Sequence, residues 1–326
     1  MKKNRKKVSI IIPFYGQTEQ DLSVPLASIN NQLGVDFDKI DVHLVNDGGD
    51  SIDIGRFDIF SNLDLHYHEL LENVGAGMAR QYGIDHSESE YLMFMDSDDS
   101  FNGVESLYNF FDAAKQKHNP NIIEGKSLIL LDDSKTKFSY RFSNFGSNGL
   151  FAHWFKRSYI EKLNLRFQPE LRIFEDQYFV GIAKQLNTES LVSINALVYV
   201  YRFRKDSLSE GRKVFYKFAE QNVLKYRLQL QYYQTKLPQD KFNEQLSGAL
   251  IDLFLNFKNF SVHNKDLFFN ELEKLAVAFP KLPEELWNQM EEGARRRIQV
   301  KELGYGKVDS RQLKPFLKEL YQGKHE

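Results

Sequence analysis

A continuous apolar run near the start of the chain, Val8-Ser9-Ile10-Ile11-Ile12-Pro13-Phe14, constrains the fold most. Its β-branched residues do not alternate with polar ones, which predicts a strand buried on both faces, as in a parallel sheet. Further strand-like segments follow at residues 40–45, 63–68 and 91–95, and helical patterns lie between and after them at 18–32, 74–86 and 103–117. The alternation predicts an α/β fold with a mostly parallel, Rossmann-like sheet flanked by helices. Pro25 is expected to disturb the first helix.

The pattern changes twice further along the chain. Residues 121–140 read as irregular strand-like pieces, residues 143–149 as a polar loop, 175–185 as a helix and 191–203 as the last strand. Beyond them, helical spacing prevails to the end of the sequence, interrupted by Pro238, Pro280 and Pro283. We therefore predict a larger domain at residues 1–208 and a smaller all-helical domain at 209–326.

Composition excludes several classes of protein. Of 326 residues, 42 % are hydrophobic and none is cysteine, which fits a folded protein without disulfides, thiolate zinc sites or thiol nucleophiles. Residues 1–205 hold 23 Lys and Arg against 28 Asp and Glu, and residues 206–326 hold 20 against 17, so neither part is basic enough to indicate nucleic-acid binding. No apolar run is long enough for a transmembrane segment, and we expect a cytoplasmic protein.

The strongest chemical signal is the segment Asp96-Ser97-Asp98-Asp99, which follows an apolar strand. Ligands of open α/β sheets bind at the carboxyl ends of strands, and crowded carboxylates repel one another unless a cation lies among them. Carboxylate oxygens suit Mg²⁺ or Mn²⁺. A solvated turn before the next helix is the alternative interpretation.

Weaker signals stand at two other strand-to-helix junctions. Asp47, in the segment Asn46-Asp47-Gly48-Gly49, can accept a hydrogen bond from a nucleobase, although Asp-Gly also forms simple turns. The glycines of residues 73–80 would let backbone N–H groups approach a phosphate, but Arg80 stands where a dinucleotide fingerprint needs a small residue.

Glu175 and Asp176 stand at the predicted start of a helix. One of them could act as a general base toward an attacking hydroxyl, or both could only complement the helix dipole. That dipole lowers the pKa of a carboxylate, so a base working at neutral pH needs burial or a neighbouring acid. His66 and His68 share one face of a strand, and without a third ligand close in sequence we expect packing or surface positions for them.

Taken in order, residues 8–15, 44–48, 73–80, 96–99 and 175–176 resemble the family 2 glycosyltransferases, which have the GT-A fold. The resemblance covers residues 8–205. It implies an inverting, metal-dependent hexosyltransferase that uses a nucleotide-sugar, with a UDP-sugar as the expected donor and Mn²⁺ or Mg²⁺ as cofactor. Asn46 and Gly49 depart from the residues that many relatives carry, which we interpret as tuning of the nucleotide pocket.

The resemblance also implies roles for individual residues. Those expected to bind the donor nucleotide are Pro13, Phe14, Tyr15, Asp47, Arg80, Asp96 and Ser97. Asp98 would coordinate the metal, and Asp176 would be the catalytic base. Arg204, Lys205 and Glu175 are candidates for contacts with the diphosphate or the acceptor, and a polar interdomain linker is the alternative for the first two.

The acceptor is left open by these residues. A bacterial or phage-related glycan, a cell-wall polymer or a protein is expected, and the C-terminal helices could bind it or form a homo-oligomer. Two other functions stand as alternatives: a glycosyltransferase acting on a modified nucleobase in DNA, and a protein that holds a nucleotide-sugar without turning it over.

Overall fold

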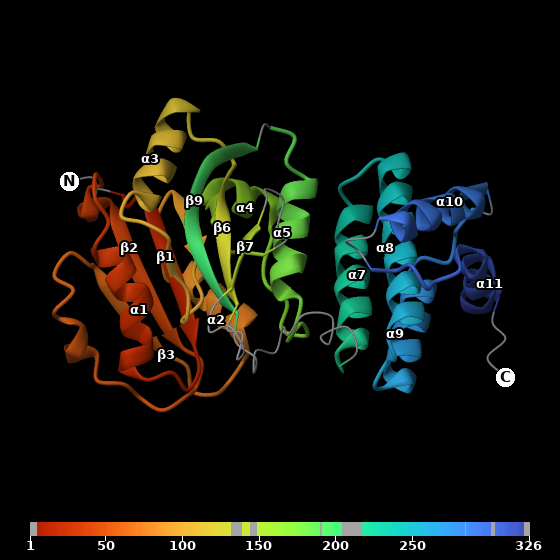
Figure 1. The fold of residues 1–326 in the computed structure, drawn as a ribbon, viewed down its shortest axis with the longest axis horizontal. Coiled ribbons are helices and arrows are strands. Elements are labelled where there is room, and N and C mark those ends of the chain that lie inside the picture. Colours follow the sequence, from red (N-terminus) through yellow and green to blue (C-terminus); the bar gives the residue numbers. More distant parts are fainter. Residues whose placement is uncertain are drawn as a thin grey trace. The chain divides into compact units, whose positions relative to one another are not determined.

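The computed structural model describes residues 5–131, 139–143, 149–189, 191–203, 217–283, 285–300 and 304–322. The chain divides into two compact units, Met1–Ser207 and Leu208–Glu326. Figure 1 shows the strands gathered in the first unit and helices alone labelled in the second.

Four parallel strands form the N-terminal half of the sheet, in the order β3 (Leu65–Glu69), β2 (Ile40–Asn46), β1 (Val8–Phe14) and β4 (Tyr91–Phe94). Every residue of β1, β2 and β4 is buried; the apolar runs of β1 and β4 predict this, whereas β2 also buries the polar residues Asp41, His43 and Asn46. Their parallel direction brings the carboxyl ends of these strands to one edge of the sheet.

Antiparallel pairings continue the sheet beyond β4. The order is β4, β8 (His153–Lys156), β6 (Ile122–Leu131), β9 (Val192–Phe203) and β5 (Ser100–Phe101), and β7 (Ser139–Ser143) pairs with β6. Strand β8 runs antiparallel to both of its neighbours, whereas β6 and β9 are parallel to each other. The sheet is thus mixed, and the predicted Rossmann-like α/β class is confirmed.

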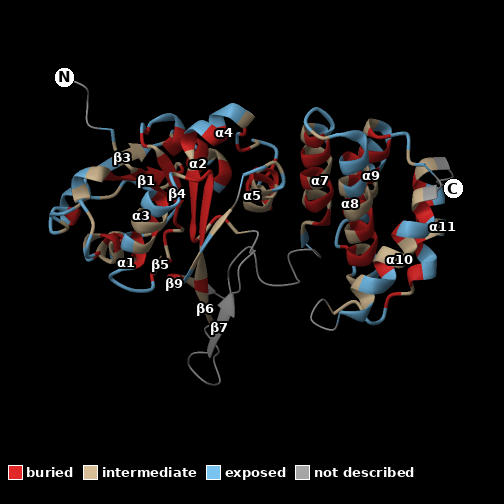
Figure 2. Ribbon diagram, turned by 90° about the horizontal axis from the view of Figure 1, so that it is seen from above, coloured by how far each residue is buried: buried red, intermediate tan, exposed pale blue. Residues whose placement is uncertain are grey.

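Helices cover both faces of this sheet (Figures 1 and 2). Helices α1 (Glu19–Asn30) and α3 (Ser106–Gln116) lie on the face where Ile10 and Ile12 enter the main core. Helices α2 (Ala76–Asp85), α4 (Arg157–Leu163) and α5 (Glu175–Gln185) lie on the other face. There Gly83 brings α2 against β1, since a Cβ at that position would lie 2.5 Å from Ile11 Cγ2.

Helix α1 continues through Pro25 without a break, contrary to the expected disturbance. Thr18 begins it with a capping box, in which its hydroxyl accepts from the Asp21 N–H and the Asp21 carboxylate accepts from the Thr18 N–H. Pro25 itself is buried.

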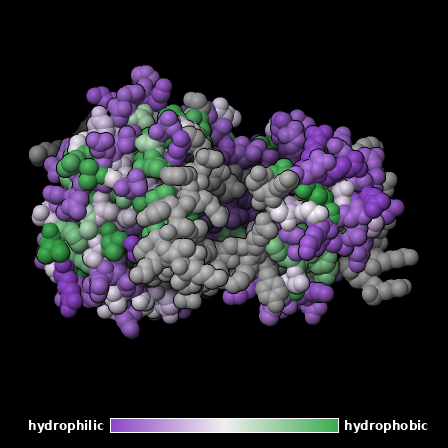
Figure 3. All heavy atoms as spheres, viewed as in Figure 1, coloured by the Kyte–Doolittle hydropathy of each residue, from purple (hydrophilic) through white to green (hydrophobic). Residues whose placement is uncertain are grey.

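The second unit is helical among its described residues. It contains α7 (Ala219–Gln234), α8 (Gln239–Asn259), α9 (Lys265–Ala278), α10 (Glu285–Gln299) and α11 (Leu313–Gln322). Buried residues such as Leu250, Phe254 and Leu272 give this unit a core of its own. No helix in the described part of the chain is long and apolar enough to cross a membrane. On the face drawn in Figure 3, hydrophobic residues form separate patches among hydrophilic ones.

Candidate active site

The carboxyl ends of β2 and β4 carry the acidic residues expected at a ligand site of an open α/β sheet. Asp47 follows β2 and Asp96 follows shortly after β4. Between them β1 ends at Phe14, which is buried in the core, while the next residue, Tyr15, has an exposed fraction of 57 %. Pro13 is buried within β1. Tyr15 is therefore the member of this expected nucleotide-binding trio that reaches solvent.

Asp47 fixes the loop that leads into α2. Its two carboxylate oxygens accept hydrogen bonds from the backbone N–H groups of Val74 (2.8 Å) and Gly75 (2.9 Å). Burial raises the pKa of Asp47, and these two hydrogen bonds oppose that shift. Asp47 thus has a positioning role in this structure, and its contact with a nucleobase stays a prediction.

Arg80 joins two acids that lie far apart in the sequence. From α2, its guanidinium donates to Asp96 Oδ1 (2.7 Å) and to Glu175 Oε1 (2.8 Å). Its side chain is 7 % exposed; burial opposes its charge, but the two carboxylates more than offset this effect and raise the pKa of Arg80. Gly77 makes the approach of α2 to α5 possible, because a Cβ there would lie 3.0 Å from Glu175 Cγ. Arg80 therefore joins Asp96, which is expected to bind the donor, to Glu175, which stands next to the expected base.

Asp176 lies next to this bridge, in the first turn of α5. The helix begins after Phe174, whose φ of 67° lies in the left-handed region. Asp176 Oδ1 accepts from the N–H of Gln177 (2.7 Å). Burial, followed by the negative charge of Glu175, raises the pKa of Asp176 to about 7. Its environment thus outweighs the helix dipole and gives a carboxyl group with the pKa of a general base.

The three acids of residues 96–99 do not point the same way. Asp99 is only 1 % exposed and accepts from the Tyr199 hydroxyl (2.7 Å) and the Arg202 N–H (2.8 Å). Burial raises its pKa, as does the charge of Asp96. By contrast, the Asp96 side chain is 39 % exposed, and Asp98 is half-buried. Asp99 therefore anchors the segment to β9, while Asp96 and Asp98 lie closer to the surface.

Tyr199 and Arg172 belong to this site although no sequence motif indicates them. The Tyr199 hydroxyl accepts from the N–H of Asp96 (3.2 Å) in addition to its bond with Asp99. Arg172 is exposed and lies against the start of α2, 3.0 Å from where a Cβ of Gly75 would stand. Ser97 is buried, and Arg204 and Lys205 lie outside the described residues.

These features define a class of protein: an α/β domain of the GT-A type with an acidic site at the carboxyl ends of its parallel strands. Residues 9–163 match the model of glycosyl transferase family 2. The chain therefore carries a family 2 glycosyltransferase domain, as its motifs predict.

Similar proteins include a glycosyltransferase whose sequence matches part of this chain. TarP of Staphylococcus aureus (strain N315), a poly(ribitol-phosphate) beta-N-acetylglucosaminyltransferase, is 29 % identical over 191 residues, which make up 53 % of this chain and 56 % of TarP. The match thus spans little more than half the length of that relative.

Solved structures agree in fold over nearly the whole chain. S. aureus TarS 1-349 in complex with UDP-GlcNAc has a TM-score of 0.67 and 18 % identity, covering 96 % of this chain and 92 % of that one. A mannosyltransferase of Pyrobaculum calidifontis in complex with GDP-Man and Mn²⁺ has a TM-score of 0.53 and 15 % identity, covering 98 % and 88 %. At these identities the likeness concerns the fold.

Proposed function

We propose that this chain is an inverting glycosyltransferase that moves a sugar from a UDP-sugar to an acceptor hydroxyl. The observation that carries the proposal is the bridge from Asp96 through Arg80 to Glu175, because it joins the acids after β4 to the start of α5, where Asp176 stands. A donor-binding surface and a base are both needed for direct displacement at an anomeric carbon.

Asp176 is the proposed base. Its raised pKa of about 7 means that it holds a proton more tightly than an ordinary carboxylate and can accept one from a hydroxyl near neutral pH. Arg80 and Glu175 are positioning residues in this proposal. Arg80 holds Asp96 on one side, and Glu175 raises the proton affinity of Asp176 on the other.

The residues after β4 fit a divalent cation. Asp98 and Asp96 offer carboxylate oxygens near the surface, which suit Mg²⁺ or Mn²⁺, whereas Asp99 is turned inward to Tyr199. When bound, the cation would neutralise charge on the departing nucleoside diphosphate. Asp98 would hold it, and Asp96 would be kept in place by Arg80.

The donor and acceptor are inferred from similar proteins. The fold shared with TarS, a protein solved with UDP-GlcNAc, supports a UDP-sugar as donor. The likeness to TarP, named for poly(ribitol-phosphate), supports the hydroxyl of a polyol-phosphate polymer as acceptor. The second unit would bind that polymer or form a homo-oligomer.

The test is nucleotide release from UDP-GlcNAc, UDP-glucose, UDP-galactose and GDP-mannose, with and without poly(ribitol phosphate), in Mn²⁺ or in chelator. We expect metal-dependent UDP release from one UDP-sugar that rises with the polymer. Asp98→Asn should lower the rate by about 100-fold or more, since it weakens the cation site.

Asp58→Asn is the matched control, because Asp58 is an exposed acid of the same unit. It should turn over at the wild-type rate. Absence of both nucleotide binding and metal-dependent release across the panel would contradict the proposed function.

A further inference from the structure

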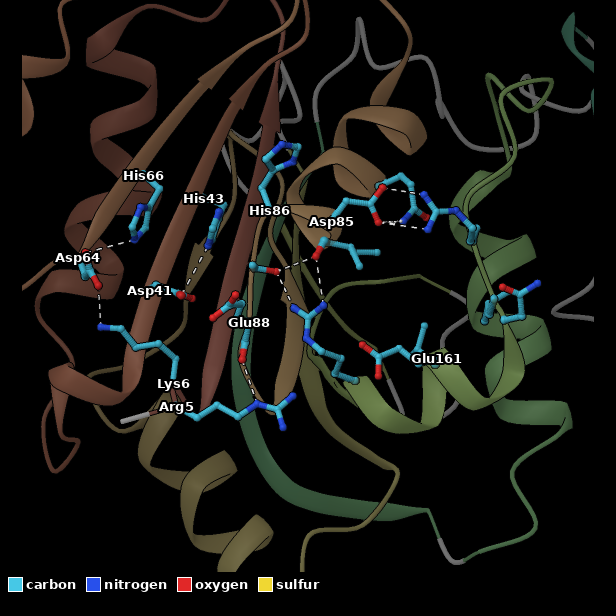
Figure 4. Close-up of a pocket in the computed structure, with 18 residues that line it drawn as sticks. Arg5, Lys6, Asp41, His43, Asp64, His66, Asp85, His86, Glu88 and Glu161 are labelled. Atoms are coloured by element: carbon cyan, nitrogen blue, oxygen red, sulfur yellow. Dashed lines mark hydrogen bonds and ion pairs between the residues drawn. The ribbon is translucent and has the colours of Figure 1, made fainter. Parts of the chain in front are cut away.

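A second polar cluster lies on the same sheet, toward the opposite ends of β2 and β3 from Asp47. Asp41 and His43 come from β2, and His66 of β3 is paired in register with His43. His43 is also paired with Ile11, which contacts α2 at Gly83, so the cluster lies on the face that α2 covers. Figure 4 shows the two imidazoles side by side, with Asp41 next to His43.

Two buried atoms of this cluster lack a hydrogen-bond partner among the described residues. They are Asp41 Oδ1 and His43 Nε2, on side chains of residues that are only 6 % and 2 % exposed. His43 Nε2 is 3.6 Å from Asp41 Oδ2, which is too long for a hydrogen bond. Buried polar atoms without partners are rare and unfavourable, so a ligand between them would satisfy both.

The two imidazoles are already oriented by other residues. His43 Nδ1 lies 3.0 Å from His68 Nε2; with His43 as donor, its Nε2 carries a lone pair toward Asp41. His66 Nε2 lies 3.2 Å from Asp64 Oδ1, and Asp64 in turn binds Lys6 Nζ at 2.6 Å. Metal-binding histidines commonly have their ring orientation fixed in this way by a partner at the other nitrogen.

The basic side chains nearby donate their hydrogen bonds to other groups. Lys6 also donates to the carbonyl of Ile40 (3.1 Å). Arg157 donates to the carbonyls of Ser89 (2.8 Å) and Ile84 (3.1 Å) and to the hydroxyl of Ser87. The cluster opens into a pocket of about 1280 Å³, which leaves room for water as a further ligand.

We propose that Asp41, His43 and His66 form a binding site for a transition-metal ion, of which Zn²⁺ is the favoured example. One ligand atom from each residue lies within 4.8 Å of the others. Tetrahedral Zn²⁺ needs its ligand atoms about 3.4 Å apart, so the three side chains would close in slightly around the ion. Two imidazoles and one carboxylate suit Zn²⁺ and disfavour Mg²⁺, which takes oxygen ligands.

The ion would tie β2 to β3 and act on stability rather than on sugar transfer. The site is separate from the acids at residues 96–99 and does not depend on the proposed function. When free Zn²⁺ is present at about 100 times its Kd, its binding should raise the Tm of the first unit by roughly 5–10 °C.

The test is isothermal titration of the full chain with Zn²⁺ in excess Mg²⁺, which occupies sites made of oxygen ligands only. We expect one Zn²⁺ to bind per chain. Its affinity should fall by about 10-fold to 100-fold in His66→Gln and in Asp41→Asn. His263→Gln, an exposed histidine of the second unit, is the matched control and should bind like wild type.

His66 is the primary variant because its exposed side chain can be changed without opening the core. The Zn²⁺-induced rise in Tm should disappear in His66→Gln, while the Tm without metal stays close to that of wild type. Wild-type protein that binds no Zn²⁺ under these conditions, or equal affinity in wild type and both site variants, would overturn the proposal.

Discussion

Two opposing influences act on the pKa of Asp176. The start of a helix favours a negative charge, and the Gln177 N–H donates to its carboxylate. Burial and the charge of Glu175 act in the opposite direction and raise its pKa to about 7. The sequence predicts the position of this acid, but the direction of the shift depends on its burial in the folded protein, which outweighs the opposing charge of Arg80.

This shift has a consequence for stability. An unfolded Asp loses its proton near pH 3.9, whereas folded Asp176 keeps it to about pH 7. Between these values the folded state binds more protons, so the contribution of Asp176 to stability falls as pH rises from about 4 to about 7.

Asp176→Asn removes that dependence. Its free energy of unfolding relative to wild type should increase by about 2–3 kcal/mol from pH 5 to pH 8, measured by urea unfolding in chelator. Asp58→Asn should show no such trend, and a difference for Asp176→Asn that is the same at both pH values would argue against the raised pKa.

The residues that escaped prediction depend on neighbours across strands. Tyr199 reaches Asp99 because β9 is paired with β5. His43 lies next to His66 because the two residues are paired between β2 and β3. Neither relation is visible as spacing along the chain, which is why the sequence alone does not bring His66 together with Asp41 and His43.

Among the elements, those with continuous apolar runs are the predictable ones. β1 and β4 follow directly from such runs, because a strand buried on both faces needs no polar alternation, whereas β2 also buries Asp41 and His43. The long strand β6 mixes Glu124 and Lys126 with apolar residues, and its partners β8 and β9 come from later in the chain. The extended conformation of β6 is therefore a property of the assembled sheet.

The turn after β2 depends on a glycine. Gly48 has a φ of 73°, and a Cβ there would lie 2.3 Å from the backbone carbon of Glu72. Gly16 has a similar φ of 79°, but nothing lies within 4 Å of its Cβ position. Substitution of Gly16 therefore tests backbone strain alone, whereas substitution of Gly48 tests the same strain together with steric contact with the loop before α2.

Gly16→Ala should lower the free energy of unfolding by about 1 kcal/mol, through backbone strain alone. Gly48→Ala should cost about 2 kcal/mol more and weaken UDP binding, because the displaced backbone adjoins the loop that Asp47 holds. Urea unfolding and UDP titration of both variants check this, and equal losses would show that the Glu72 contact is relieved without cost.

In the whole molecule, a family 2 glycosyltransferase domain is followed by a helical unit with its own core. The sequence predicts the fold class because strand and helix patterns are local. The contact between the segments 96–98 and 175–176 is not local in the sequence. Arg80 makes it by binding Asp96 and Glu175. The role of the helical unit stays a prediction, since none of its residues shares a pattern with a known site.

The most direct test of the account separates donor binding from chemistry in Asp176→Asn. Titration with the active UDP-sugar should give a Kd within about threefold of wild type, while kcat with acceptor should fall by about 100-fold to 10,000-fold, because the variant cannot take a proton. If donor affinity collapses and kcat persists, Asp176 is structural and the proposed mechanism is wrong.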